Sequence, residues 1–177
     1  VICSQLPMGP RGLNKFLQHK QCSGITQVSM SALRGKRVVI DISIYMYRFK
    51  TNEELIENFY TMFNIFKKNK IIPLFVFDGK PPVEKTEQIN MRKQERNRAE
   101  LEYNNLIQEQ NNSKSYNKYN LLSLKRKKTK ICFQDIEEIK MLLTFYGFMY
   151  VEADGEADNL CSYYVTSGQA WACISDD

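Results

Sequence analysis

The chain has 177 residues, of which 43% are hydrophobic and 12% aromatic, and it carries a net charge of +5. This length and apolar content suit one cored domain and leave no room for two full ones. No stretch has the unbroken apolar length that a bilayer needs, and the N-terminus lacks the order of a signal peptide. We therefore expect an intracellular protein, nuclear, cytoplasmic or in a viral factory, with no membrane partner.

The cysteine and histidine content narrows the chemistry. Five scattered cysteines without a CxxC pair argue against a disulfide framework and against a zinc site. His19 is the only histidine, so catalysis by Ser-His-Asp or Cys-His groups has almost no material here.

The first seven residues have no clear structural purpose, and Met8-Gly9 is a plausible true start, so we interpret residues 1–7 as an upstream extension. The domain would then span residues 8–177, and it looks cut at its C-terminus. The first predicted strand is RVVID at 37–41. After it, Thr51 and Glu54 stand at capping-box spacing before a helix with an apolar stripe of five residues: Leu55, Phe59, Met62, Phe63 and Phe66.

The second predicted strand, PLFVFD at 73–78, also ends on an aspartate. Residues 84–110 are charged and helix-prone without a wide apolar stripe, which predicts a helix that projects from the body. Residues 111–120 are polar and low in complexity, which favours a mobile loop or an insert without a role. Residues 79–130 hold 13 Lys/Arg against 6 Asp/Glu, so this basic block favours a polyanionic partner, although many such runs are only solvated helix faces.

Towards the C-terminus, residues 133–147 show helical spacing and stop at Gly147, FMYVEA at 148–153 reads as a strand, and a further helix follows Gly155. AWACISDD at 170–177 is the last strand. Continuous apolar strands alternating with helices predict an α/β fold with a mostly parallel sheet. Because ligands gather at the carboxyl ends of such strands, Asp41, Asp78 and Asp177 should meet at one edge.

Converging carboxylates repel one another unless cations bind among them. Oxygen ligands without His or Cys pairs select Mg²⁺ or Mn²⁺, and two such ions can clamp a phosphate and activate an attacking water. Glu156 and Asp158 in GEAD could join them only at a helix entrance, because positions two apart diverge on a regular helix. Each aspartate could instead be an ordinary helix cap or turn residue, and the GEAD pair could simply complement a helix dipole.

Lys85, Arg92 and Arg96 are spaced to share one helix face. Beside a metal edge, such cations could hold a phosphate and stabilise charge in its transition state. Alternatively, they form weak salt bridges with Glu95 and other helix neighbours.

Six motifs in this order resemble the flap-endonuclease and xeroderma-pigmentosum-G-type 5′ nucleases: MGPRGL, VVIDIS, PLFVFDGKPPVEK, an R-x-x-x-R run, GEAD and ISDD. The resemblance spans Met8 to the end. It implies a PIN-like nuclease domain that uses two Mg²⁺ ions to cut DNA, most simply as a monomer. The metal ligands that it implies are Asp41, Asp78, Glu156, Asp158 and Asp177.

The resemblance also implies DNA contacts. Lys85 and Arg92 match the cations that grip the phosphate at the base of a helical arch, here roughly residues 84–132, through which a single-stranded 5′ flap or end would pass. Tyr47 matches an aromatic that stacks on a base, although its surroundings read equally well as core, and Gly9 matches a residue near DNA. The remaining candidates are basic: Arg96, Lys125, Arg126, Lys127, Lys128 and Lys130.

In family members, further aspartates, a helix-hairpin-helix and a route to a sliding clamp follow the position of Asp177. We therefore expect the 177-residue chain alone to bind metal poorly and to be nearly inactive. The alternative function is a nucleic-acid-binding scaffold of the same fold without catalysis. An aspartyl-phosphate phosphatase of the haloacid-dehalogenase type ranks far behind, because Ser43 and Lys80 stand where its second aspartate belongs.

Overall fold

The computed structural model describes residues 28–110 and 118–174. Their elements follow in this order: η1 (Met30–Leu33), β1 (Arg37–Asp41), α2 (Ile42–Thr51), α3 (Leu55–Lys68), β2 (Ile72–Phe77), η2 (Val83–Lys85), α4 (Thr86–Gln110), α5 (Lys118–Lys128), α6 (Phe133–Tyr146), β3 (Met149–Glu152), α7 (Ala157–Thr166) and β4 (Ala172–Ile174). Gly9, Asp177, His19, Cys3 and Cys22 lie outside the described residues, as does the 1–7 extension.

The four strands form one parallel sheet in the order β3-β2-β1-β4, which confirms the predicted fold class. In this order β1 and β2 lie at the centre, and Asp41 pairs in register with Val76. The carboxyl ends of both central strands therefore reach the same edge, as the sequence predicted for Asp41 and Asp78.

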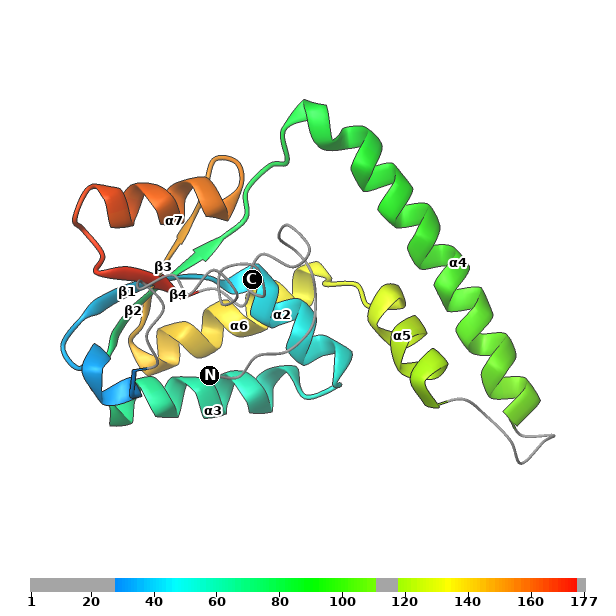
Figure 1. Ribbon diagram of the computed structural model, residues 1–177, viewed down its shortest axis with the longest axis horizontal. Helices are drawn as coiled ribbons and strands as arrows, with labels where there is room; N and C mark the ends of the chain where they lie inside the picture. Colours follow the sequence, from blue (N-terminus) through cyan, green and yellow to red (C-terminus); the bar gives the residue numbers. More distant parts are fainter. Residues whose placement is uncertain (1–27, 111–117, 175–177) are drawn as a thin grey trace, which may run out of the picture.

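Helices cover both faces of the sheet (Figure 1), with α7 on one side and α2, α3 and α6 on the other. Alternate strand residues face the two layers: Val38 and Ile40 pack against α3 and α6, whereas Val39 packs against α7. The larger core is aromatic, with Phe63 in edge contact with Phe75 at 5.2 Å between ring centroids. Such edge-to-face pairs add to the stabilisation that apolar burial provides.

The helices predicted after the first strand and before Gly147 are present, but the predicted capping box at Thr51 and Glu54 is wrong. The stripe on α3 is buried except for the partly buried Met62, and Gly147 ends α6 in the left-handed conformation with φ 67°. The predicted capping box is wrong, because Thr51 is the last residue of α2 and its hydroxyl donates to the Tyr47 carbonyl at 2.8 Å. Glu54 is the N-cap residue of α3 and makes no side-chain cap bond.

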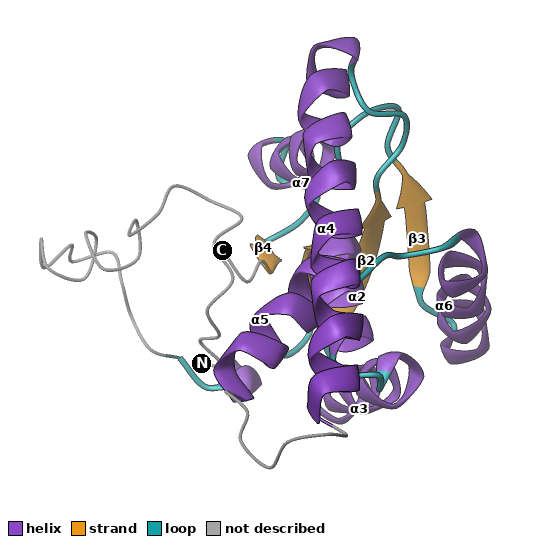
Figure 2. Ribbon diagram, turned by 90° about the vertical axis from the view of Figure 1, so that its right-hand side faces the viewer, coloured by secondary structure: helices purple, strands orange, loops and turns teal. Residues whose placement is uncertain are grey.

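The helices α4 and α5 project from the body of the domain (Figures 1 and 2), in the segment that the resemblance treats as an arch. The 25 residues of α4 correspond to about 38 Å of helix. Ala99 and Leu124 are buried, and the Lys128 ammonium lies 3.8 Å from the centroid of the Tyr103 ring. The polar stretch at 111–120 is not all loop, because α5 already begins at Lys118.

Two side-chain contacts connect the base of this projection to the rest of the domain. Lys125 on α5 pairs with Glu53 at 2.9 Å, and the Thr51 and Thr129 hydroxyls lie 3.0 Å apart. The first of these contacts lowers the pKa of the Glu53 carboxyl, through the hydrogen bond from Lys125. The α5 helix is therefore tied to the corner between α2 and α3. Among the described helices, none is both long and apolar enough to cross a bilayer.

Candidate functional site

The site begins where β1 and β2 end. Asp41 is the N-cap residue of α2, and its Oδ1 accepts the Ser43 backbone N–H at 2.9 Å. The Asp41 side chain is nearly buried, with only 7% exposed. The capping role that a strand-terminal aspartate could have is thus real for Asp41, and the same bond holds its carboxylate at the sheet edge.

Asp78 joins the two central strands to α7. Its Oδ2 accepts the Ser43 hydroxyl at 2.6 Å, and its Oδ1 accepts the Ala157 backbone N–H at 2.9 Å. Ser43 therefore donates to both aspartates, through its N–H to Asp41 and its O–H to Asp78. No role for Ser43 in this site was predicted from the sequence, although its place two residues after Asp41 is typical of a helix-capping partner.

Glu156 and Asp158 flank this connection, because Ala157 stands between them. Glu156 is the N-cap residue of α7 and Asp158 lies in its first turn, so the two acids stand at a helix entrance, as the spacing required. The positive end of the helix dipole favours carboxylates at this place. Four of the five predicted metal ligands thus gather at one edge of the sheet; the fifth, Asp177, lies outside the described residues.

Gly79 lets the end of β2 approach the segment before α7. Its N–H donates to the Gly155 carbonyl at 2.7 Å, and a side-chain carbon at this position would lie 1.8 Å from the Ala153 carbonyl oxygen. Only glycine fits there. In the sequence DGK, the aspartate therefore supplies the carboxylate, and the glycine allows the close backbone approach that brings Asp78 to α7.

Two thiols lie near this edge, and their place beside the carboxylates was not predicted from the sequence. Cys161 on α7 is buried, whereas Cys173 on β4 is exposed. The hydrogen bond with Cys161 lowers the pKa of the Cys173 thiol, while partial desolvation and the Asp41 and Asp158 carboxylates oppose that shift. The same bond, with burial, raises the pKa of Cys161. The Asp41 and Asp158 carboxylates each raise the pKa of both thiols, as expected if the two carboxylates lie on one side of the sheet.

The three cations predicted to bind phosphate, Lys85, Arg92 and Arg96, differ in their exposure and in their ion-pair partners. Lys85 is the last residue of the short helix η2, directly before α4 begins at Thr86, and Arg92 lies in the second turn of α4. The Lys85 ammonium pairs with the Glu156 carboxylate. Arg92 is exposed and Arg96 half-buried on α4, and neither forms an ion pair with the described residues, Glu95 included.

The basic candidates on and after α5 fall into two groups. Lys125 and Lys128 are half-buried and engaged with Glu53 and the Tyr103 ring, whereas Arg126, Lys127 and Lys130 are exposed. Tyr47 on α2 is 41% exposed and stands on the same helix as Ser43. Contact of these side chains with DNA remains a prediction from the sequence.

The donor chemistry fits a hard divalent cation, because the gathered ligands are carboxylate oxygens at one edge. Among residues 28–110 and 118–174, however, no three His, Cys, Asp or Glu side chains are placed closely enough to hold one ion. The Lys85 ammonium at Glu156 and the two hydrogen bonds to Asp78 supply the positive partners at these carboxylates instead.

Comparison with known proteins places the chain in a family. Residues 8–99, more than half of the chain, match the XPG N-terminal domain. Flap endonuclease 1 of Candida glabrata is 29% identical over 96% of this chain and 46% of its own length. The catalytic core of Rad2 in complex with DNA substrate superposes with a TM-score of 0.63 at 23% identity, over 92% of this chain and 45% of that one.

Flap endonuclease-1 from Methanococcus jannaschii is 26% identical with a TM-score of 0.52, over 86% of this chain and 51% of that chain. The chain thus spans about half the length of the relatives that it matches. These structures share the fold of this chain, and the sequence match covers the segments that carry Asp41 and Asp78. The chain belongs to the family defined by the XPG N-terminal domain.

Proposed function

We propose that this chain forms the nuclease domain of a structure-specific 5′ nuclease, which hydrolyses phosphodiesters in DNA that carries a single-stranded 5′ flap or end. The observation that supports this most is the gathering of Asp41, Asp78, Glu156 and Asp158 around Ser43 and Ala157 in a chain of this family.

The proposed cofactor is Mg²⁺, as two ions, with Mn²⁺ as a substitute. The residues that would hold it are Asp41, Asp78, Glu156 and Asp158, together with Asp177 from outside the described part. When bound, divalent ions at such a site neutralise charge on the phosphate and its leaving oxygen and lower the pKa of water.

The chain's own cations have the complementary task of holding the substrate. Lys85 stands at Glu156, so a phosphate oxygen that arrives at this edge meets an ammonium already within reach of the carboxylates. Arg92 projects from α4 without a described ion-pair partner and can bind a phosphate through its planar fork. Both would stabilise charge that develops on the phosphate in the transition state.

The projection formed by α4 and α5 would hold the single strand. Its exposed cations, Arg126, Lys127 and Lys130, are free to contact phosphates, whereas Lys125 and Lys128 also serve the fold. This division supports a phosphate-binding surface on α5 that is anchored to the domain by Glu53.

The test compares Asp78→Asn with Asp154→Asn in the whole protein, which is a matched pair because Asp154 is an exposed carboxylate just before Gly155. Mg²⁺-dependent cleavage of a 5′-flap DNA should fall at least about 100-fold in Asp78→Asn, or ~2.7 kcal/mol of transition-state stabilisation. Binding of the same DNA, measured by fluorescence anisotropy, should persist.

Cleavage by Asp154→Asn should equal that of the unmodified protein. Unchanged cleavage in Asp78→Asn would rule out the assignment of Asp78. If the unmodified protein binds flap DNA but cuts none, the alternative of a non-catalytic DNA-binding scaffold would be correct.

A further inference from the structure

Six exposed cations gather at the edge of the sheet where the strands begin, opposite to the edge that carries the carboxylates. They come from the end of α3 and from the segments that enter β1 and β2: Arg34, Lys36, Arg37, Lys67, Lys68 and Lys70. The Gly35 N–H donates to the Lys70 carbonyl at 2.9 Å, which joins the two entering segments. We call this set the basic edge. In Figure 1 it lies to the left, whereas α4 and α5 project to the right.

The basic edge has no acidic neighbours to neutralise it. None of its six side chains forms an ion pair with a described residue. The segments that surround it, 28–37, 65–72, 145–149 and 166–172, contain no aspartate or glutamate, and neither do residues 1–27 and 111–117. Lys67 and Lys68 can complement the negative end of the α3 dipole, but Lys36, Arg37 and Lys70 lie outside the helices. Such an excess of one sign attracts an anionic partner.

A cavity of about 390 Å³ opens within the basic edge, between the end of α3 and the start of β3. Lys67 and Lys70 line it together with five apolar residues: Ile71, Ile72, Pro73, Phe148 and Met149. Ile72 leaves 44% and Met149 leaves 52% of its surface exposed, so part of this apolar lining faces solvent. The volume lies within the range of about 300–1,000 Å³ that ligand pockets occupy. One large apolar side chain of a partner can enter it.

Two of the cations lie over aromatic rings beside this cavity. The Lys67 ammonium is 4.9 Å from the centroid of the Phe148 ring, and the Lys36 ammonium is 5.7 Å from that of the Trp171 ring. Trp171 is itself 54% exposed. Contacts of this kind hold an ammonium next to apolar surface and leave its N–H donors available to an anion. The basic edge therefore offers positive charge and apolar surface side by side.

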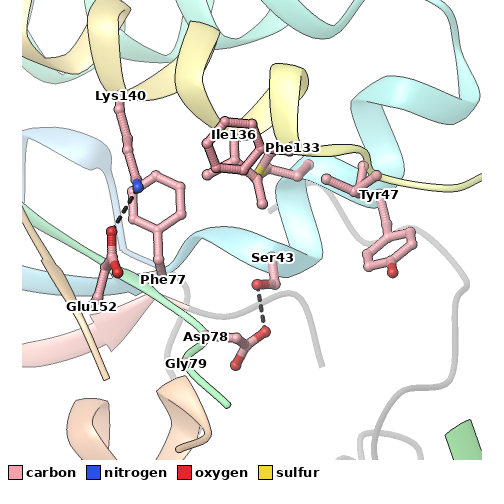
Figure 3. A pocket seen from close by; sticks show the side chains of 11 residues that line it. Ser43, Tyr47, Phe77, Asp78, Gly79, Phe133, Ile136, Lys140 and Glu152 are labelled. Atoms are coloured by element: carbon pink, nitrogen blue, oxygen red, sulfur yellow. Dashed lines mark hydrogen bonds and ion pairs between the residues drawn. The ribbon is translucent and has the colours of Figure 1, made fainter. Parts of the chain in front are cut away.

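The position of the basic edge separates it from the proposed chemistry. The carboxylate edge, where Ser43 donates to Asp78 (Figure 3), lies at the other end of the same strands. The five residues of β1 alone span about 17 Å. DNA held at the carboxylates would have to pass around the domain to reach the basic edge, and its phosphates would not fill an apolar cavity. A peptide with carboxylates on both sides of one aromatic residue matches the charge and the cavity together.

We propose that the basic edge is a docking surface for an acidic peptide segment of a partner protein. The carboxylates of the segment pair with Lys67, Lys70 and the cations beside them, and one aromatic side chain enters the cavity. This role goes beyond the proposed nuclease activity. Because the docked segment and the carboxylates are at opposite ends of the strands, peptide and DNA can bind at the same time. The partner would thus hold the nuclease without blocking its site.

The experiment uses a fluorescein-labelled peptide in which one phenylalanine stands between two runs of glutamate. Binding to the whole protein is measured by fluorescence anisotropy at low salt. One control peptide replaces the phenylalanine by alanine, and a second replaces the glutamates by glutamine. The unmodified protein should bind the first peptide at least about 5-fold more tightly than either control, because both the anchor and the charges contribute. Added NaCl should weaken this binding.

Two matched pairs of variants locate the binding. Lys67→Glu with Lys70→Glu should weaken peptide binding by at least about 5-fold, whereas Arg126→Glu with Lys127→Glu, which reverses two exposed cations on α5, should not. Met149→Glu should weaken it too, because Met149 lines the cavity. Met141→Glu should not, although Met141 is also exposed. Flap cleavage and melting temperature should be unchanged in the variant of Lys67 and Lys70.

Equal binding of the three peptides, or equal losses in the two double variants, would overturn the docking surface. Displacement of the peptide by single-stranded DNA, with weaker binding of that DNA to the variant of Lys67 and Lys70, would overturn it as well, because nucleic acid would then be the occupant. Reduced flap cleavage by this variant at an unchanged melting temperature would likewise assign the basic edge to the DNA interface. None of these results depends on Asp78, so the two proposals can fail separately.

Discussion

Replacing Gly79 by alanine tests how the site is assembled. The added Cβ would lie 1.8 Å from the Ala153 carbonyl oxygen and 2.9 Å from the Ala153 carbonyl carbon. Both atoms are backbone and cannot rotate away, so the segment between β3 and α7 must shift. The shift should break the 2.7 Å hydrogen bond from Gly79 N–H to the Gly155 carbonyl and pull Ala157 away from Asp78.

Overpacking of this kind costs about 1–3 kcal/mol. For a domain of this size, each kcal/mol corresponds to about 2–4 °C, so the melting temperature of Gly79→Ala should fall by about 2–12 °C. Gly155→Ala is the matched control, because a Cβ there meets nothing within 4 Å. Thermal unfolding followed by circular dichroism measures both, and the control should stay within about 0.5 kcal/mol of the unmodified protein.

Cleavage gives the second measurement on the same variants. Since Gly79 positions Asp78 against α7, Gly79→Ala should lose flap cleavage at temperatures where it is still folded, whereas Gly155→Ala should keep it. A Gly79→Ala protein with an unchanged melting temperature and full activity would refute the reasoning.

Three further predictions concern the charges and the core. Asp135→Asn should destabilise the protein more at pH 7 than at pH 3. Burial opposes the shift, but hydrogen bonds from Cys132 and Lys50 hold the folded pKa of Asp135 below its ordinary value of 3.8. Its stabilisation is therefore fully present above pH 3.8 and is lost as the pH falls from there through the folded pKa. Urea unfolding at both pH values measures this, and an equal loss at both would contradict it. Phe63→Ala should cost about 3–5 kcal/mol in urea unfolding, because the ring is fully buried; a loss under 1 kcal/mol would show a looser core. Arg126→Ala with Lys127→Ala should reduce the salt dependence of DNA binding by about one to two counterions, without a change in melting temperature; an unchanged slope would remove α5 from the DNA interface.

The sheet was predictable because its strands are short apolar runs that end on polar residues. The segments PLFVFD and RVVID are recognisable as strands from their own residues alone, because burial on both faces of the sheet removes the alternation of polar and apolar residues. The amphipathic helices α3 and α6 were predictable for a similar reason, because one stripe of each is buried in the larger core.

The α2 helix was missed because its sequence, ISIYMYRFKT, is apolar or aromatic on more than one side. Without the helix, Thr51 looked like a cap for the next one, while in the structure it closes α2 and contacts Thr129. The capping-box prediction was wrong because the spacing of Thr51 and Glu54 is a pattern of only four residues, which does not by itself show where a helix begins.

The candidate site was predictable as a set of carboxylates, but not as a geometry. Strand ends indicated Asp41 and Asp78. Their link through the Ser43 hydroxyl, 35 residues from Asp78, and the approach of Gly79 to Gly155 depend on the folded chain. The helical segment was predicted as one unit, whereas the structure begins it with the short helix η2, which ends at Lys85, because nothing in the sequence separates η2 from α4.

Anomalous diffraction from crystals of the protein soaked in Mn²⁺ tests the central claim most directly. The account predicts manganese bound to the carboxylates of Asp41 and Asp78, at distances near the ~2.1 Å typical of small hard cations with oxygen ligands, with Glu156 or Asp158 close by. Manganese bound elsewhere on the protein, with none at the Asp41 and Asp78 carboxylates, would contradict it.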